Sequence, residues 1–367
     1  MALKFTDQKD RPADLQKSLD STKVTYRRLG KSGLKLSLPI LGAMSFGHKD
    51  WQPWVVDDFG AVEELLLAAY DRGLNTWDTA NVYSNGVSEQ MIGDVITKNK
   101  IDRKKLLLLT KCYGTVGESP AAMHIRYPEM KTTKDYVNQG GLSRAAIFNA
   151  VDASLSRLQT DYIDLLQIHR FDYDVPVEET MKALHDLVSS GKVRYIGASS
   201  MWAHQFQEMQ TVAATHGWTQ FVSMQNHYSL CYREEEREMN AYCHKTGVGL
   251  IPWAPLYRGH LARPLDSEST TRNDVSKEAG TKMDAESMTS EDREIVKRVQ
   301  ELAGKKGWAM SVVALAWIVQ KGTIPIVGFS NVKRLDEAVG VNGKELTEEE
   351  MKWLEEPYRP KAIVGHS

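Results

Sequence analysis

The sequence is poor in cysteine. Only three cysteines occur among its 367 residues, and none belongs to a Cys-x-x-Cys pair or lies near a histidine at zinc-finger spacing. Such usage is typical of a reducing compartment, in which disulfides do not persist. We therefore expect a cytoplasmic protein built without disulfides or a structural metal. The three are Cys112, Cys231 and Cys243.

A charge excess and long apolar runs are also missing. The formal net charge is −2 and the isoelectric point is near 6.6, so no basic face for nucleic acid or a membrane surface is indicated. No apolar run approaches the roughly 20 residues of a membrane span, and the polar residues 1–23 lack the apolar core of a signal peptide. We expect a small-molecule partner and an N-terminal extension over residues 1–23, whose composition allows mobility. The oligomeric state stays open.

The glycine patterns of phosphate-binding loops are not present. No Gly-x-Gly-x-x-Gly follows an apolar run, and Gly30-Lys31-Ser32 is not a P-loop because Thr25 stands where that motif needs its first glycine. If the protein uses a dinucleotide, it must therefore bind it without a Rossmann motif.

Eight short apolar runs rich in Leu, Ile and Val predict β-strands. They are residues 40–43, 74–77, 106–110, 162–168, 193–198, 221–224, 248–252 and 324–327. Between several of them, apolar residues three or four apart predict helices that bury one face. These patterns are Val62/Leu65/Leu66/Ala69, Ile147/Val151/Leu155/Leu158, Met181/Leu184/Val188 and Val312/Leu315/Ala316/Val319. The alternation predicts parallel strands joined by helical crossovers.

Eight strands alternating with helices fit a single (β/α)8 TIM barrel over residues 24–367. Near-continuous apolar strands are typical of a sheet that is buried on both faces. Such a barrel needs about 250 residues, which leaves room for insertions. An open doubly wound sheet is the alternative.

Polar or functional side chains follow nearly all of the predicted strands. In a barrel the carboxyl ends of the strands form one ring, where barrel enzymes carry their chemistry. Each such residue alone is more often a cap, a surface lysine or a satisfied core histidine, so it is their coincidence that favours the barrel. They are Gly42, Met44, Asp78, Lys111, His169, Ser199, Ser200, Gln225, Asn226, Trp253 and Gly328 to Ser330.

Two long connections interrupt the alternation, at residues 113–143 and 258–292. Both leave the carboxyl-end face of the predicted barrel, and connections of this length are usually functional lids or disordered. The first has enough apolar residues to line a pocket, whereas the second is rich in Ser, Thr, Asp and Glu and is expected to be mobile. We expect substrate specificity to lie in these two segments.

Four of the strand-end residues suit the reduction of a carbonyl group together: Asp78, Tyr83, Lys111 and His169. A phenol, with an ordinary pKa of about 10, is a poor acid at neutral pH unless a nearby ammonium stabilises the phenolate. An aspartate can hold that ammonium charged and aimed, and a histidine can orient the carbonyl oxygen. General acid catalysis of this kind contributes about 10²–10⁴ in rate. The hydride must come from a cofactor, because no side chain delivers one.

Several residues near the strand ends suit a nicotinamide dinucleotide. Ser199, Ser200 and Gln225 could bond the carboxamide, and Trp253 could stack on the ring. The segment from Gly328 begins a predicted helix beside Lys333 and Arg334, and a helix N-terminus with adjacent cations suits a 2′-phosphate. For that segment alone, a capped surface helix with solvated cations is the simpler explanation.

The sequence resembles the aldo-keto reductase family from about Val24 to its end. The resemblance rests on motifs that are specific in combination: Gly42-Ala-Met-Ser-Phe-Gly47, Trp77-Asp-Thr-Ala-Asn-Val-Tyr-Ser-Asn-Gly-Val-Ser-Glu89, Leu109-Thr-Lys111, Tyr162-Ile-Asp-Leu-Leu-Gln-Ile-His-Arg170, Ile196-Gly-Ala-Ser-Ser200, Met224-Gln225, Pro252-Trp-Ala-Pro-Leu256 and Val327-Gly-Phe-Ser-Asn331. It is closest to a fungal branch with versiconal hemiacetal acetate reductase-like and aryl-alcohol dehydrogenase-like members.

This resemblance implies a (β/α)8 barrel that binds NADPH or NADP+ across its strand ends and reduces a carbonyl compound, with Tyr83 as the general acid. The implied catalytic residues are Asp78, Tyr83, Lys111 and His169. The implied cofactor contacts are Gly42, Met44, Asp78, Ser199, Ser200, Gln225, Trp253, Ala254, Pro255, Leu256, Arg258, Gly328, Ser330, Lys333, Arg334 and Glu337. A dry, partly aromatic site suits aryl or medium-chain aldehydes and ketones.

Two positions depart from the family pattern. Trp253 stands where many members stack a tyrosine on the nicotinamide, which keeps the contact equivalent. Ala338 stands where many carry an asparagine associated with adenine, so we expect the adenine end to be held more loosely. The resemblance then leaves the 2′-phosphate chiefly to Arg334, with Lys333 second.

Two other functions are open. Potassium-channel β subunits, a branch of the same family that senses the cofactor state, also resemble the Pro252-Trp-Ala-Pro-Leu256 motif, but that branch tends to lack the histidine that His169 supplies here. A metal-dependent lyase would need paired carboxylates or histidines at the strand ends, and apart from Asp78 and His169 they are missing. The sequence therefore favours a carbonyl reductase.

Overall fold

The structure is a computed structural model that describes residues 11–267 and 288–366. The predictions made for residues 1–10 of the N-terminal extension, and for residues 268–287 of the second long connection, lie outside the described residues.

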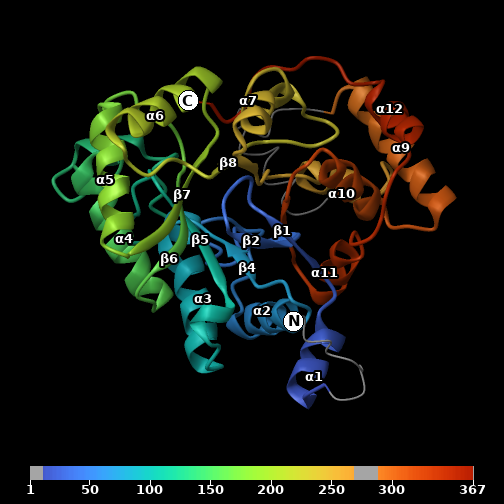
Figure 1. The fold of residues 1–367 in the computed structure, drawn as a ribbon, viewed down its shortest axis with the longest axis horizontal. Helices are drawn as coiled ribbons and strands as arrows, with labels where there is room; N and C mark the ends of the chain where they lie inside the picture. Colours follow the sequence, from blue (N-terminus) through green and yellow to red (C-terminus); the bar gives the residue numbers. More distant parts are fainter. Residues whose placement is uncertain (1–10, 268–287, 367) are drawn as a thin grey trace, which may run out of the picture.

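Eight parallel strands form a barrel at the centre of the molecule (Figure 1). They pair in the order β10-β3-β4-β5-β6-β7-β8-β9. Backbone hydrogen bonds of 2.9 Å, from Ile324 N to Leu250 O and from Ile326 N to Pro252 O, join the two ends of this sheet. The strands are β3 (Ile40–Gly42), β4 (Thr76–Asp78), β5 (Leu107–Cys112), β6 (Ile163–Ile168), β7 (Val193–Ser199), β8 (Ser223–Gln225), β9 (Gly249–Leu250) and β10 (Ile326–Gly328). The (β/α)8 barrel is confirmed, and the open sheet is wrong.

Helices surround the barrel as an outer layer (Figure 1). Most of them bury apolar residues against the sheet or a neighbouring helix. The buried residues of α2 are the four predicted from spacing, Val62, Leu65, Leu66 and Ala69. The helices are α2 (Phe59–Asp71), α3 (Val87–Lys98), α4 (Arg144–Leu158), α5 (Val177–Ser189), α6 (Ala203–His216), α7 (Met239–Thr246), α9 (Ser290–Lys306), α10 (Met310–Gln320), α11 (Val332–Val339) and α12 (Glu348–Glu355).

The register of the strands brings their carboxyl ends to one level. Gly42 of β3 pairs with Asp78 of β4 on one side and with Gly328 of β10 on the other. A Cβ at Gly42 would lie only 2.8 Å from Ile326 Cγ2, so this close approach of β3 and β10 needs glycine. Residues at the ends of β3, β4 and β10 therefore meet at one face of the barrel.

Elements that the sequence analysis did not predict precede the barrel. Helix α1 (Ala13–Ser21) lies within the N-terminal extension, has no buried residue and projects away from the barrel (Figure 1). An antiparallel hairpin follows, made of β1 (Thr25–Arg28) and β2 (Lys35–Leu38). Its turn lies against the start of β9, where Lys31 N donates to Gly247 O over 2.8 Å. The hairpin therefore contacts the end of the barrel opposite the predicted site.

No single helix among the described residues has both the length and the apolar character to cross a bilayer, and α9 and α10 meet those criteria only as a pair that bends by 102°.

Candidate active site

The four predicted catalytic residues come together at the carboxyl ends of neighbouring strands. Asp78 ends β4, Lys111 lies near the end of β5, and His169 directly follows β6. Tyr83 begins the short 3₁₀ helix η2 (Tyr83–Gly86), which follows β4. Because β4, β5 and β6 are adjacent and parallel, their ends place these side chains in one cluster.

Lys111 is the centre of this cluster. Its Nζ donates to Asp78 Oδ1 at 2.5 Å, to the Thr79 carbonyl at 2.9 Å and to the Tyr83 hydroxyl at 3.3 Å. Lys111 is completely buried, and Asp78 is 2% exposed. Burial alone would lower the pKa of Lys111, but the Asp78 carboxylate and the Tyr83 hydroxyl outweigh it, and the pKa is raised. The lysine is therefore a fixed positive charge beside the phenol.

Two glutamine amides complete the environment of Asp78. Gln167 Nε2 and Gln225 Nε2 donate to Asp78 Oδ2 at 2.9 and 3.0 Å, and Gln225 Nε2 also donates to Gln167 Oε1 at 2.7 Å. The sequence analysis missed Gln167. Its signal is the side-chain period of two in a strand, because Gln167 lies two residues before His169 and so faces the same side of β6. Gln225, predicted only as a cofactor contact, also belongs to this network.

Tyr83 lies among aromatic side chains. Its half-buried ring meets His169 edge to face at a centroid distance of 6.0 Å, and Trp51 at 6.3 Å. Trp51 in turn contacts Trp54 at 5.9 Å. Both tryptophans belong to the segment between β3 and α2, and no role was predicted for either of them. They form an apolar wall beside the phenol.

His169 is held as a neutral imidazole. Burial lowers its pKa well below the ordinary value, and the positive charges of Arg170 and Lys111, with His124, lower it further. A neutral imidazole has one N–H donor and one acceptor nitrogen. His169 can therefore donate a hydrogen bond to a neutral oxygen at physiological pH.

The first long connection, residues 113–143, folds against η2. The Asn85 side-chain amide donates to the carbonyl oxygens of Ser119 and Ala122, at 2.7 and 3.0 Å. At the start of the connection, Asn81 Nδ2 donates to Gly114 O at 3.2 Å. His124 of this connection lies close enough to His169 to lower the pKa of His169. The segment thus borders the catalytic cluster, as a pocket-lining role requires.

The predicted nicotinamide contacts lie around the ends of β7, β8 and β9. Ser199 Oγ donates to Gln225 O at 2.8 Å, and Trp253 Nε1 donates to Ser200 Oγ at 3.1 Å. Both serines are buried, and Trp253 is half-buried. The serine hydroxyls therefore fix the backbone of β8 and the indole ring of Trp253.

The remaining residues predicted as cofactor contacts are more dispersed. Ala254, Pro255, Leu256 and Arg258 follow β9, and Ala254 and Arg258 have the left-handed φ values of 52° and 56°. Gly328 ends β10, and Asn331 caps α11 by accepting from Arg334 N at 3.0 Å. Ser330, Lys333 and Arg334 are exposed, Met44 and Glu337 are half-buried, and Ala338 is buried.

A further cation, Arg263, lies at the same end of the barrel, and the sequence analysis did not predict it. It directly follows the 3₁₀ helix η6 (Tyr257–Ala262), and its Nη2 is buried without a hydrogen-bond partner among the described residues. Burial lowers the pKa of Arg263, and the charge of Arg334 lowers that pKa further. Among the described residues neither arginine forms an ion pair with a carboxylate, so these two cations favour an anion at this end of the barrel.

The chain matches a known protein family over most of its length. The aldo/keto reductase family model matches residues 40–359. This chain belongs to the aldo-keto reductase family. As such it is an oxidoreductase that reduces carbonyl groups to alcohols.

Three aldo-keto reductase relatives match along almost the whole chain. An aldo-keto reductase of Fusarium vanettenii is 53% identical over 361 residues, which cover 97% of both chains. Versiconal hemiacetal acetate reductase of Aspergillus parasiticus is 49% identical over 340 residues, 92% of this chain and 98% of its own. An aryl-alcohol dehydrogenase-like protein of Schizosaccharomyces pombe is 48% identical over 345 residues, 93% of this chain and 97% of its own. The resemblance to this fungal branch is confirmed.

Behind Trp253, this aldo-keto reductase has a stack of three rings. His227 lies between Trp253 and Tyr232, nearly parallel to both, at centroid distances of 4.2 and 4.1 Å. His227 is 2% exposed, and neither ring nitrogen has a hydrogen-bond partner among the described residues. Burial lowers its pKa well below the ordinary value, assisted by Arg258 and Lys361. The stack fixes one face of the Trp253 ring.

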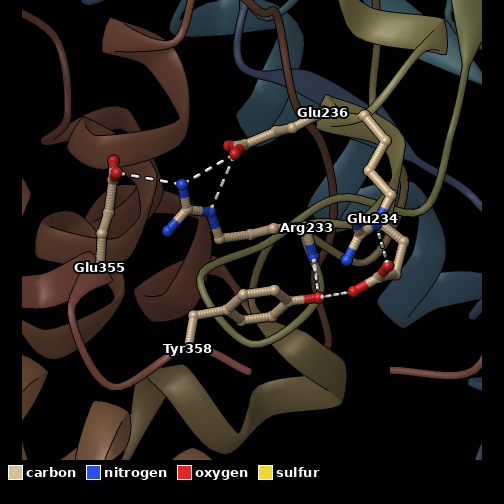
Figure 2. Close-up of a pocket in the computed structure, with 6 residues that line it drawn as sticks. Arg233, Glu234, Glu236, Glu355 and Tyr358 are labelled. Carbon is tan, nitrogen blue, oxygen red and sulfur yellow. Dashed lines mark hydrogen bonds and ion pairs between the residues drawn. The ribbon is translucent and has the colours of Figure 1, made fainter. Parts of the chain in front are cut away.

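The C-terminal segment of this aldo-keto reductase is tied to the segment after β8 through a charged pocket (Figure 2). Arg233 Nη2 contacts Glu236 at 2.7 Å and Glu355 at 3.0 Å, while the Tyr358 hydroxyl donates to Glu234 at 2.5 Å. Because these charges are paired with one another, the pocket serves to hold the two segments together.

Beyond Tyr358 the chain continues to the predicted nicotinamide site. Val364 N donates to the Tyr232 hydroxyl at 2.9 Å, and His366 Nε2 contacts Glu235 at 2.9 Å. A Cβ at Gly365 would lie 3.3 Å from Trp253 Cζ2 and 3.4 Å from Ser200 Oγ. The C-terminal residues therefore border Trp253, although the sequence analysis assigned them no role.

Proposed function

We propose that this aldo-keto reductase reduces aryl or medium-chain aldehydes and ketones with NADPH, and that Tyr83 protonates the carbonyl oxygen. The observation that supports this most directly is the position of Lys111 Nζ, which contacts both the Asp78 carboxylate at 2.5 Å and the Tyr83 hydroxyl at 3.3 Å. A general acid needs a stabilised conjugate base, and this contact provides one.

Lys111 makes it easier for Tyr83 to give up its proton. An ammonium beside the phenol oxygen stabilises the phenolate that is left after the transfer. Because Asp78 and the Thr79 carbonyl hold Lys111 Nζ in place, its charge needs no reorganisation as the proton moves. We infer that proton donation by Tyr83 contributes about 10²–10⁴ in rate.

His169 and the tryptophan wall would orient the substrate. The neutral imidazole can donate to the carbonyl oxygen, and its edge-to-face contact with Tyr83 brings both donors to the same space. Trp51 and Trp54 offer flat apolar surfaces to an aryl or alkyl group and exclude water. These contacts support aryl and medium-chain carbonyl compounds as the substrate class.

The residues at the strand ends fit a nicotinamide dinucleotide. Trp253 offers a ring fixed by Ser200 and His227, and Gln225, whose amide hydrogens go to Asp78 and Gln167, keeps Oε1 to accept from the carboxamide. We infer that the loop after β9, with Arg258, holds the pyrophosphate. When bound there, the nicotinamide supplies the hydride for carbonyl reduction.

NADPH is favoured over NADH because cations gather where the 2′-phosphate would lie. Arg334 lies in the first turn of α11 and interacts electrostatically with Arg263, whose Nη2 is a buried donor without a partner among the described residues. Like charges so close repel one another, and a dianionic phosphate would relieve that repulsion.

The alternative of a cofactor-sensing protein like the potassium-channel β subunits finds no support. The relatives named above are reductases or dehydrogenases by name, and His169 is present beside Tyr83. No group of three His, Cys, Asp or Glu in the described part of the chain could hold a metal ion, so nothing there favours a metal-dependent lyase.

Binding and turnover measured on the purified protein test the proposal. NADPH is titrated by its fluorescence, and its oxidation is then followed at 340 nm with 4-nitrobenzaldehyde, with NADH as the comparison. We expect tight NADPH binding and steady oxidation that Tyr83→Phe largely abolishes. Binding without oxidation across several carbonyl compounds would point to a sensor, and no binding would remove the cofactor assignment.

A further inference from the structure

Arg170 is a charged residue beside the catalytic cluster for which the proposed mechanism has no use. It directly follows His169 at the end of β6 and is half-buried. A guanidinium has five N–H donors, and among the described residues one of its nitrogens, Nη1, makes a hydrogen bond, to the His169 carbonyl oxygen. The remaining donors are available to a ligand.

The surroundings of Arg170 belong to the substrate side of the site. The ring of its neighbour His169 meets Tyr83 edge to face at a centroid distance of 6.0 Å, and His169 N donates to Cys112 O, next to Tyr113, at 2.9 Å. Arg170 also interacts electrostatically with Tyr83 and Tyr113, and it lowers the pKa of His169 and His124. Tyr113 and His124 belong to the first long connection, which borders the catalytic cluster. The guanidinium therefore lies where this connection meets the catalytic residues.

No carboxylate in the described part of the chain forms an ion pair with Arg170. The carboxylate nearest in sequence is Asp172, and its two oxygens accept from backbone N–H groups instead, Oδ2 from Leu142 at 2.7 Å and Oδ1 from Asp174 at 3.0 Å. Burial lowers the pKa of Arg170, while Tyr83 and Tyr113 act in the opposite direction. A second cation, the exposed Lys131, acts on His124 from the same connection.

A partly desolvated, unpaired guanidinium is costly unless it gains an anionic partner. We propose that Arg170 binds a carboxylate on the substrate, so that this reductase prefers oxo acids: carbonyl compounds that carry a carboxylate a short distance from the reacting carbonyl. This inference rests on the proposed function, and it narrows the substrate class within it. The carboxylate would pair with the guanidinium in the two-point geometry that arginine favours, while the carbonyl oxygen reaches Tyr83 and His169.

Matched acids and esters separate charge recognition from general reactivity. The three carboxybenzaldehyde isomers are compared with the corresponding methyl formylbenzoates, which keep the ring and the aldehyde but lose the charge. We expect at least one acid to exceed its ester by about 10- to 100-fold in kcat/KM, because a hydrogen bond to a charged partner contributes that much. The ratio should fall to about 1 in Arg170→Gln and be partly retained in Arg170→Lys.

Arg293→Gln is the matched control, because Arg293 is an exposed arginine of α9, outside the segments expected to contact the substrate. It should leave the acid-to-ester ratio unchanged. Turnover of esters and acids with equal kcat/KM in the wild type would overturn the carboxylate site and leave the proposed function standing. Failure to oxidise NADPH with any of these aldehydes would instead reject the proposed function.

Binding of benzoate gives a readout that does not depend on turnover. Calorimetric titration of benzoate into the protein should give a dissociation constant that Arg170→Gln raises by about tenfold or more and that Arg293→Gln leaves unchanged. Circular dichroism melting of each variant shows whether it is folded, and Arg170→Lys serves if the glutamine variant is not. Equal benzoate affinity in the wild type and the folded Arg170 variant would overturn the inference.

Discussion

Lys111 Nζ lies 2.5 Å from Asp78 Oδ1, and both side chains are buried. A buried ion pair contributes little net stability, but removing one partner leaves the other charge uncompensated. Here the Asp78 carboxylate also accepts hydrogen bonds from the side-chain amides of Gln167 and Gln225. This network holds the Lys111 ammonium beside the Tyr83 hydroxyl. The pair is therefore better explained by the proposed proton transfer than by stability.

Tyr83→Phe removes the proposed proton donor and keeps the ring. We expect kcat to fall by about 10²–10⁴, while the NADPH dissociation constant stays within about twofold, since the hydroxyl contacts Lys111 within the cluster. Stopped-flow and steady-state assays at 340 nm measure the rate, and fluorescence titration measures binding. Tyr127→Phe, at a tyrosine that is 39% exposed, is the control. A fully active Tyr83→Phe would remove Tyr83 from this role.

Lys111→Met leaves the Asp78 carboxylate buried without its counter-ion. We expect the free energy of unfolding at pH 7 to fall by about 3 kcal/mol, measured by urea denaturation, and the carbonyl reductase activity to be lost. The double variant Asp78→Asn with Lys111→Met should recover much of the stability but none of the activity. Lys192→Met, at a surface ion pair with Asp152, should cost less than about 1 kcal/mol. Equal stability of Lys111→Met and wild type would contradict this account.

Replacing Arg334, in the first turn of α11, or Arg263, at the end of η6, should separate the two cofactors. Arg334→Ala and Arg263→Ala remove the groups proposed to bind the 2′-phosphate, so each should weaken NADPH binding by about tenfold. NADH lacks that phosphate, and its dissociation constant should hardly change. Lys352→Ala, an exposed cation on α12, controls for net charge. If NADPH and NADH weaken equally, these arginines do not select the cofactor.

The stability of the protein should decline in mild acid because of His169 and His227. Burial holds the pKa of both side chains well below the ordinary value, so the unfolded chain binds more protons than the folded one as the pH falls through about 6.5. The free energy of unfolding is therefore expected to fall with decreasing pH below that point, by up to about 1.4 kcal/mol per pH unit for each histidine.

His227→Phe tests the contribution of His227 to that decline. Phenylalanine keeps a flat ring between Trp253 and Tyr232 but cannot take up a proton. The free energy of unfolding of the variant should therefore fall less between pH 7.5 and pH 5.5 than that of the wild type. Urea denaturation at both pH values measures it. His204→Gln, an exposed histidine of α6, should leave the pH dependence as it is. An unchanged pH dependence in His227→Phe would mean that His227 takes up its proton as readily in the folded protein as in the unfolded chain.

Much of the fold follows from local sequence pattern. All eight strands and the apolar face of α2 lie where the spacing of apolar residues predicted them, because burial on both faces of a parallel sheet demands continuous apolar runs. The strand limits are less well predicted, because apolar composition reports burial and not pairing. Phe221, at the start of one predicted strand, instead has its backbone N–H bound by the Gln210 side chain, and β8 begins at Ser223.

The sequence by itself determined that Asp78, Tyr83, Lys111 and His169 would meet, since each belongs to a strand end or the turn after it and a barrel gathers those ends. Only the tertiary structure decided what surrounds them. Gln225 reaches Asp78 across 147 residues, and His227 is enclosed by rings from the segments after β8 and β9. The remaining donors of Arg170 and the electrostatic interaction of Arg263 with Arg334 are likewise invisible in local pattern. Such contacts depend on the packing of distant segments, and no periodicity in the chain records them.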